Sequence, residues 1–133
     1  MSTATPTKTA RTLIAAGTSV VAATPQRAVL DLKSTFGGLL SVKITNGATG
    51  PTLPASVIVS IAHNATLPSA GALGADWKKF QKVTHNVTAN SIGEWVFQIP
   101  QGVMGLQVEI GENTVQNVTG EAYLSELTSI NNA

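Results

Sequence analysis

Two histidines and seven acidic residues are the side chains of this chain that could support metal or acid–base chemistry. A metal site built on His63 and His85 would need a further ligand, such as Asp76 or Glu94. The two histidines are not spaced as H-x-x-x-H, and no carboxylate–histidine spacing accompanies them. We therefore interpret both histidines as turn or edge residues of the fold.

A pair of carboxylates, as glycosidases use, is the second possibility that the acidic residues raise. They are Asp31, Asp76, Glu94, Glu109, Glu112, Glu121 and Glu126. Most of them fall at predicted outward or turn positions, where a solvated carboxylate is the ordinary state. The chain also lacks a G-x-S-x-G elbow, a phosphate-binding loop and a G-x-G-x-x-G fingerprint. The sequence predicts a protein that is not an enzyme and has no cofactor and no metal.

Charge and hydropathy restrict the partners that this chain can be expected to bind. Charged residues make up 11% of the chain and the net charge is +1, against about 25% charged residues in a typical soluble domain. This balance predicts no nucleic-acid partner, and no apolar run is long enough to predict a membrane span. Interface cores are also poor in charge. The composition therefore favours a protein that packs against other protein chains.

The order of apolar and polar residues predicts β-strands. Apolar residues recur at every second position in several runs, which is the period of a half-buried strand with one wet face. These runs hold Ala28/Leu30/Leu32, Leu40/Val42/Ile44, Val57/Val59/Ile61, Trp95/Phe97/Ile99 and Leu106/Val108/Ile110, and a last strand is predicted over Val118 to Ile130. Turn signals rich in Gly, Pro and Asn separate them. We expect an all-β, antiparallel β-sandwich of jelly-roll type with eight or nine short strands.

The segment from Asp76 to Val83 is compatible with two secondary structures. Trp77 and Phe80 are three residues apart, which suits one face of a helix with Asp76 as its N-cap. The segment is short, however, and the β-branched residues that follow it favour a strand. We predict a strand, which places Trp77 and Phe80 on opposite faces.

The beginning of the chain has a different composition from the rest. Ser2 to Thr12 alternates threonine with small residues and has nothing to bury. Residues 1–12 are therefore predicted to form an extended N-terminal arm, and residues 13–133 a single β-sandwich domain. Lys8 and Arg11 precede an apolar stretch, as in a secretory leader, but polar residues break that stretch and an arm is preferred.

Six residues are candidates for contact with a partner. Large aromatic side chains carry much of the energy of interfaces, and an extended arm can pair with a strand of another protein. The candidates are Thr5, Thr7, Lys8 and Arg11 in the arm, together with Trp77 and Lys78. A carbohydrate-binding jelly roll is an alternative from another class, and it would use Tyr123 and Trp77 as exposed aromatic rings.

Several phrases of the sequence resemble small virion structural proteins of tailed bacteriophages, over about residues 27 to 130. The phrases are Leu30-Asp31-Leu32, Gly37-Gly38-Leu39-Leu40-Ser41-Val42-Lys43-Ile44-Thr45-Asn46-Gly47, Ile99-Pro100-Gln101-Gly102-Val103-Met104-Gly105-Leu106-Gln107-Val108-Glu109 and Glu121-Ala122-Tyr123-Leu124-Ser125-Glu126. The resemblance implies a jelly-roll capsid decoration (cement) protein on the virion surface. It further implies a homotrimer that binds the major capsid protein or other virion subunits. A tail, baseplate or fibre component is the alternative position on the particle.

Overall fold

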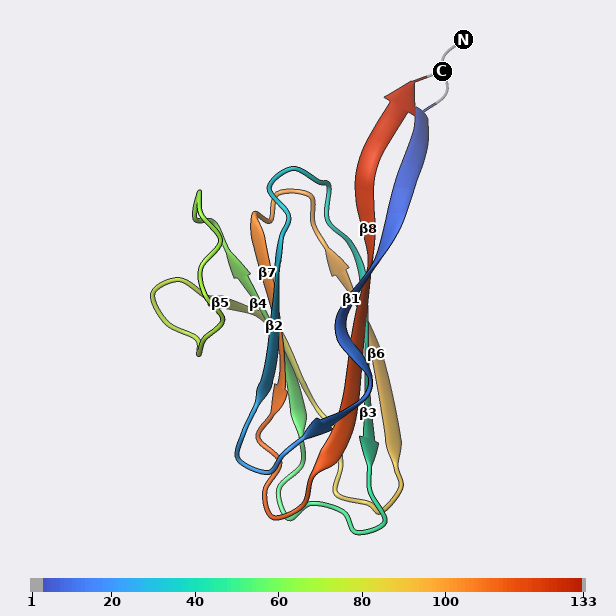
Figure 1. The fold of residues 1–133 in the computed structure, drawn as a ribbon, viewed down its shortest axis with the longest axis vertical. Helices are drawn as coiled ribbons and strands as arrows, with labels where there is room; N and C mark the ends of the chain where they lie inside the picture. Colours follow the sequence, from blue (N-terminus) through green and yellow to red (C-terminus); the bar gives the residue numbers. More distant parts are fainter. Residues whose placement is uncertain (1–3, 133) are drawn as a thin grey trace.

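The computed structural model describes residues 4–132, which form eight β-strands and no helix (Figure 1). The strands are β1 (Ala4–Val20), β2 (Gln26–Asp31), β3 (Gly38–Asn46), β4 (Ser56–Ala62), β5 (Lys78–Thr84), β6 (Ile92–Ile99), β7 (Gly105–Gly111) and β8 (Val118–Asn132). The described residues accordingly contain no helix that could cross a membrane.

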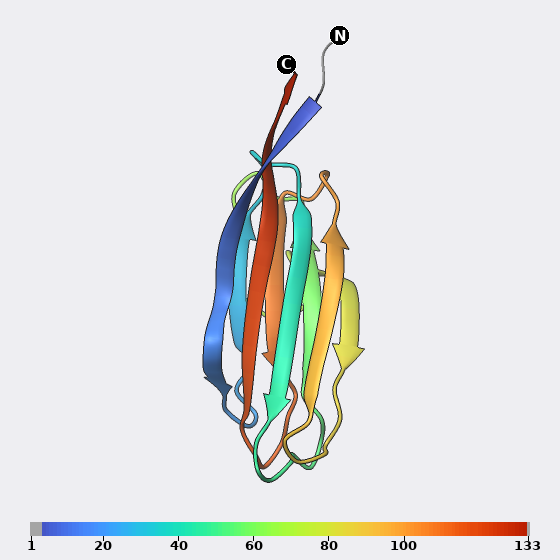
Figure 2. The ribbon, with the colours of Figure 1, turned by 90° about the vertical axis from the view of Figure 1, so that its right-hand side faces the viewer.

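The strands form two four-stranded antiparallel sheets that pack face to face (Figures 1 and 2). Sheet A has the order β1-β8-β3-β6, and sheet B has the order β2-β7-β4-β5. Successive strands mostly alternate between the sheets, and the first strand pairs with the last, as in a jelly roll. The predicted fold class is confirmed, with eight strands.

The core lies between the sheets and is built from the alternating apolar residues that the sequence displays. Leu40 of β3 is opposite Phe97 of β6 and Leu124 of β8, so the inner face of sheet A is apolar across three strands. Leu106 and Val108 of β7 face them from sheet B and are fully buried. Burial of such side chains contributes roughly 1.5–3 kcal/mol each.

The ambiguous segment is a strand, as predicted. β5 begins at Lys78, and Phe80 packs against the core while Trp77 is buried on the outer side of sheet B. The two rings thus lie on opposite faces of the chain. Pairing of β5 with β4 supplies backbone hydrogen bonds that an isolated helical turn would not gain.

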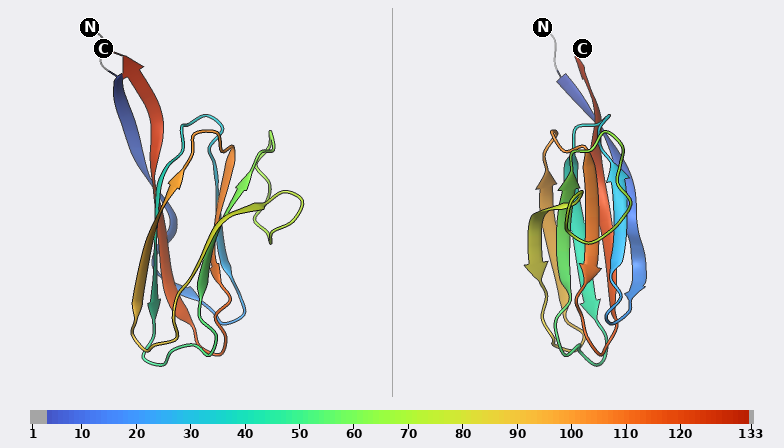
Figure 3. Two further views of the ribbon diagram at one scale, coloured as in Figure 1. Left: turned by 180° about the vertical axis from the view of Figure 1, so that it is seen from behind. Right: turned by 90° about the vertical axis from the view of Figure 1, so that its left-hand side faces the viewer.

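The outer face of sheet B is dry at Ser60 and Gln107, contrary to the alternation expected for β4 and β7. Ser60 and Gln107 point away from the core, yet they are 0% and 1% exposed. The loop of residues 63–77 lies over them (Figure 3), and the Gln107 carboxamide is joined to Gly71 by two hydrogen bonds of 2.9 and 2.7 Å. Trp77 donates a hydrogen bond of 2.8 Å from Nε1 to the Ser69 carbonyl beneath the same loop. The wet face was predicted because the sequence pattern shows only which residues alternate, not what a later loop covers.

Residues 4–12 of the predicted arm are the first half of β1 and are paired with β8 from Ala4 opposite Asn132 to Thr12 opposite Tyr123. The arm is extended, as expected, but it pairs with β8 of the same chain rather than with another protein. The β1–β8 ribbon continues beyond the end of the sandwich (Figure 1), and β1 runs through the predicted boundary between residues 12 and 13. Residues 1–3 lie outside the described part of the chain.

Gly37 and Gly38 allow the chain to enter sheet A between β6 and β8. Both have positive φ, at 73° and 156°. A Cβ atom on Gly37 would lie 2.1 Å from the Ile99 carbonyl oxygen, and one on Gly38 would lie 2.0 Å from that of Ser125. The atoms that approach these glycines are backbone carbonyl oxygens, which cannot move aside as the end of a flexible side chain can.

We expect Gly38→Ala to lower the free energy of unfolding by about 3 kcal/mol or more, because the added methyl group overlaps a strand carbonyl. Gly102→Ala is the matched control, since a Cβ there meets nothing within 4 Å. Urea denaturation of both variants measures the effect. Equal stability of Gly38→Ala and wild type would refute the close approach.

Glu112 directly follows β7 and contacts side chains of β4 and β5, two neighbouring strands of sheet B. The Ser56 hydroxyl donates a hydrogen bond of 2.5 Å to its Oε1, and Lys82 Nζ lies 2.9 Å from the same atom. The Ser56 hydrogen bond, followed by the Lys82 interaction, lowers the pKa of Glu112 from its ordinary 4.5. Its backbone φ of 69° is left-handed, so these contacts hold an uncommon conformation.

A carboxyl group whose pKa is lower in the folded state than in the unfolded state stabilises the fold at pH values above its unfolded-state pKa. This stabilisation is lost as the pH falls from about 4.5 through the folded-state pKa. Glu112→Gln should therefore lose less stability than wild type on acidification from about pH 5 to pH 3. Urea midpoints measured across this range test the effect. Glu94→Gln removes an exposed carboxyl group from the other sheet and controls for the change in net charge. Identical acid profiles for wild type and Glu112→Gln would contradict the assignment.

Candidate functional site

The outer face of sheet A is uncovered, whereas part of the outer face of sheet B lies under a loop. Figure 2 shows sheet A face on, with no other element in front of it. The register places Leu39, Ser41 and Lys43 of β3 on this face, between alternate residues of β8 and β6. The structure thus leaves one broad sheet surface of the sandwich available to a partner.

Three large apolar side chains stand on this face without cover from the chain. Leu39 is 52% exposed, Ile92 is 57% exposed and Val96 is 66% exposed. Single exposed apolar residues are common on proteins, but these three share one sheet face with the partly exposed ring of Tyr123. We define Leu39, Ile92, Val96 and Tyr123 as the sheet A patch. Lys43 and Glu94 lie between Ile92 and Val96 on this face, so the patch combines apolar residues with charged ones, as many docking surfaces do.

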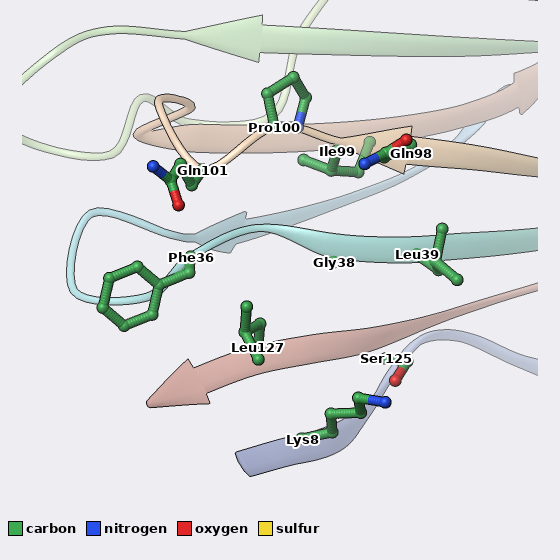
Figure 4. Close-up of a pocket in the computed structure, with 10 residues that line it drawn as sticks. All are labelled: Lys8, Phe36, Gly38, Leu39, Gln98, Ile99, Pro100, Gln101, Ser125 and Leu127. Atoms are coloured by element: carbon green, nitrogen blue, oxygen red, sulfur yellow. The ribbon is translucent and has the colours of Figure 1, made fainter. Parts of the chain in front are cut away.

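A groove of about 450 Å³ lies at the end of this face, where the β1–β8 ribbon leaves the sandwich (Figure 4). Phe36, Leu39 and Leu127 supply apolar surface, and Phe36 is 39% exposed. Lys8 is the one charged residue that lines it. The groove connects the sheet A patch to the arm.

A second, smaller groove of about 250 Å³ lies in the middle of the face. It is lined by Tyr123 together with Lys43, Glu94 and Glu121. Lys43 Nζ lies 3.9 Å from Glu121 Oε1. Desolvation, followed by the adjacent Glu121 carboxylate, raises the pKa of Tyr123 from its ordinary value of 10.0. A phenol is protonated at neutral pH in either case and can donate a hydrogen bond. This part of the face is polar and mixed in charge.

The arm residues predicted to contact a partner fall into two groups. Thr5, Thr7 and Lys8 are exposed on β1, which is an edge strand of sheet A. Arg11 instead turns to its own chain, where its Nε lies 3.3 Å from Oε1 of Glu126. The Glu126 side chain is only 2% exposed, although the sequence pattern predicted solvated carboxylates. Arg11 therefore compensates a buried charge at the root of the ribbon.

Trp77 and Lys78 lie on the other side of the molecule from the sheet A patch. Trp77 is 2% exposed beneath the loop of residues 63–77, so contact with a partner or a sugar would require that loop to open. Lys78 is exposed and donates a hydrogen bond of 2.8 Å from Nζ to the Gly74 carbonyl. The structure therefore does not bring these two residues together with the arm.

The sequence spacing of the two histidines does not predict a shared metal site, and in the structure they have separate surroundings. His63 is exposed after β4, and the His85 ring lies edge-on to Trp95 with its Nε2 3.1 Å from the Ser91 carbonyl oxygen. Within residues 4–132, no three His, Asp or Glu side chains gather as a metal site would require.

The sheet A patch was missed by the search for chemical groups, since it contains no reactive side chain. A signal was present, because Leu39 and Val96 occupy strand positions next to residues assigned to the core and so must face outward. Such positions are normally polar in a sheet with one wet face. Apolar residues there make this face a candidate docking surface.

No protein-family model matches the chain, and no curated protein matches its sequence. Similar folds occur among solved structures. A chain of infectious bursal disease virus, Gx strain, has 9% identity and a TM-score of 0.47, covering 91% of this chain and 32% of the viral one. A family 16 carbohydrate-binding module has 13% identity and a TM-score of 0.43, covering 88% and 75%. The structure titled "CBM4 structure and function" has 14% identity and a TM-score of 0.45, covering 93% and 78%. The strand order of the two sheets remains the basis of the jelly-roll assignment.

Proposed function

We propose that this chain is a non-enzymatic virion structural protein of a tailed bacteriophage, a capsid decoration protein that binds and stabilises the head shell. The observation that carries the proposal is the bare outer face of sheet A, with its patch of exposed apolar residues. The resemblance of several sequence segments to phage virion proteins is the reason for placing the chain on a phage particle. The major capsid protein is then the partner, and the outer surface of the head is the location.

The physical task of a decoration protein is to add buried area across the junctions of shell subunits. The sheet A patch supplies apolar area, and the low charge of the chain limits the cost of desolvating it. Thr5, Thr7 and Lys8 extend this surface along β1, whose outer edge has no strand beside it in sheet A. An extended segment of the shell can pair with such an edge.

The proposal includes a homotrimer, in which identical copies close around a threefold axis and leave no free interface to propagate. Size-exclusion chromatography with light scattering on the isolated protein measures this state directly. A mass three times that of the chain is expected. A tail, baseplate or fibre position is the alternative on the same particle, and electron cryomicroscopy of particles distinguishes it from the head surface.

The first experiment places a charge in the sheet A patch. Leu39→Asp and Ile92→Asp should each lower occupancy on heads assembled without the chain by about tenfold or more, because an unpaired carboxylate must be desolvated on docking. Leu53→Asp is the matched control, since Leu53 is also 57% exposed but lies in the loop before β4. Thermal unfolding must first show that all three variants are folded.

Three outcomes of this binding experiment count against the proposal. The first is that Leu39→Asp and Ile92→Asp bind heads as wild type does, the second is that Leu53→Asp loses binding equally, and the third is that the wild-type protein does not bind heads at all. In the first case the patch is not the docking surface, and in the last the head is not the partner.

The second experiment tests the arm without disturbing the sandwich. Deletion of residues 2–8 removes Thr5, Thr7 and Lys8 but keeps the Arg11–Glu126 ion pair. Head occupancy should fall because the shell loses its contacts with Thr5, Thr7 and Lys8. The melting temperature of the isolated protein should fall only modestly, because the pairs removed lie in the part of the ribbon beyond the sandwich. Undiminished occupancy would show that the arm is not a tether.

A further inference from the structure

The sandwich is open on one long side. β5 and β6 are the outer strands of the two sheets on that side, and neither pairs with a strand beyond it (Figures 2 and 3). Phe80, Val83 and Trp95 close the opening from within, where they are only partly buried against the core. A groove of about 380 Å³ remains between the two edges.

The lining of this groove combines aromatic rings with side-chain carboxamides. Phe80, Trp95 and Phe97 contribute rings, and Gln81 and Gln98 are exposed on either side of them. None of the residues that line the groove is ionisable. The groove therefore suits an uncharged ligand that offers apolar faces and hydrogen-bonding groups together.

Trp95 is held in place by the residues around it. The His85 ring packs edge-on to it, with centroids 5.7 Å apart and planes at 86°. A Cβ on Gly93 would lie 2.5 Å from the Trp95 ring and 2.6 Å from the His85 ring, so only glycine leaves room for this pair. A ring fixed before binding costs little further entropy when a ligand stacks on it.

We propose that the groove between β5 and β6 binds a neutral carbohydrate. The C–H face of a sugar ring packs on Trp95 or Phe80, and the carboxamides of Gln81 and Gln98 each donate to and accept from sugar hydroxyls. This site adjoins the docking surface on sheet A, because it shares Val96 with the sheet A patch and Gln98 with the groove at the end of that face. It gives the particle or protein that carries this chain a means of adhering to a glycan surface.

An extended peptide added to a sheet edge is the rival occupant of such a groove. β5 carries Lys78, Lys79 and Lys82, all exposed, and lysines on an edge strand oppose the addition of another strand. The bulge at Val59/Ser60 also shifts the register of β5 against β4, which makes the edge irregular. These features favour the sugar.

Tryptophan fluorescence of the full chain tests the proposal, because Trp95 lines the groove and Trp77 is sealed under its loop. The probes are cellohexaose, xylohexaose, maltohexaose and laminarihexaose. At least one should shift or quench the emission, and Trp95→Phe should abolish that signal. Gln81→Ala should weaken binding of the active probe about tenfold, because the sugar loses a hydrogen-bonding partner.

Gln116→Ala is the matched control, since that residue lies between β7 and β8 and away from the groove lining. It should bind as wild type does, and circular dichroism should show that each variant is folded. The proposal is overturned if none of the four probes binds, or if Gln81→Ala binds as tightly as wild type. Binding of an uncharged threonine-rich peptide in place of the sugars would assign the groove to strand addition instead.

Discussion

Pairing between the first and the last strand of the chain holds sheet A together and supports everything built on it. β1 follows β8 along its length, and its inward residues Ile14 and Val20 are buried in the core. The ribbon also requires a buried carboxylate, Glu126, to be matched by Arg11 from the opposite strand. Two-stranded ribbons are marginal by themselves, so this one depends on its continuity with the sandwich. The arm and the sheet A patch are thereby joined into one surface.

The two sheets differ in how their outer faces meet the solvent. Sheet B is covered by the loop of residues 63–77, which uses the Trp77 ring and the Gln107 carboxamide to attach itself. The loop buries Ser60 as well, and its hydroxyl has no hydrogen-bond partner among the described residues, a cost that the other contacts of the loop must offset. Sheet A has no such cover, and its exposed apolar residues are the reason to look there for a partner. The two outer faces therefore present different chemistry to their surroundings.

Much of the fold was predictable because alternation has a direct geometric meaning. The runs around Leu40, Phe97 and Leu106 became inner faces of strands, and the glycine-rich turn signals separate them as expected. What sequence reasoning missed are contacts between residues distant in the chain. The cover over the wet face expected for β4, the pairing of the extended arm with β8 and the burial of Glu126 each depend on a partner that no local pattern displays. The sheet A patch was visible in principle at Leu39 and Val96, but recognising it requires knowing which strands share a face.

The position of the strand ends has a mechanical meaning. Ala4 and Asn132 are opposite one another at the tip of the ribbon, so both ends of the described chain leave from the same point. Tension applied between these two residues would load the β1–β8 hydrogen bonds one pair after another, in the manner of a zipper. A load applied between Ala4 and the body of sheet A runs along the strand and stretches many pairs at once. A subunit held by its arm on one side and by its sheet face on the other would experience the second geometry, in which the same hydrogen bonds share the force.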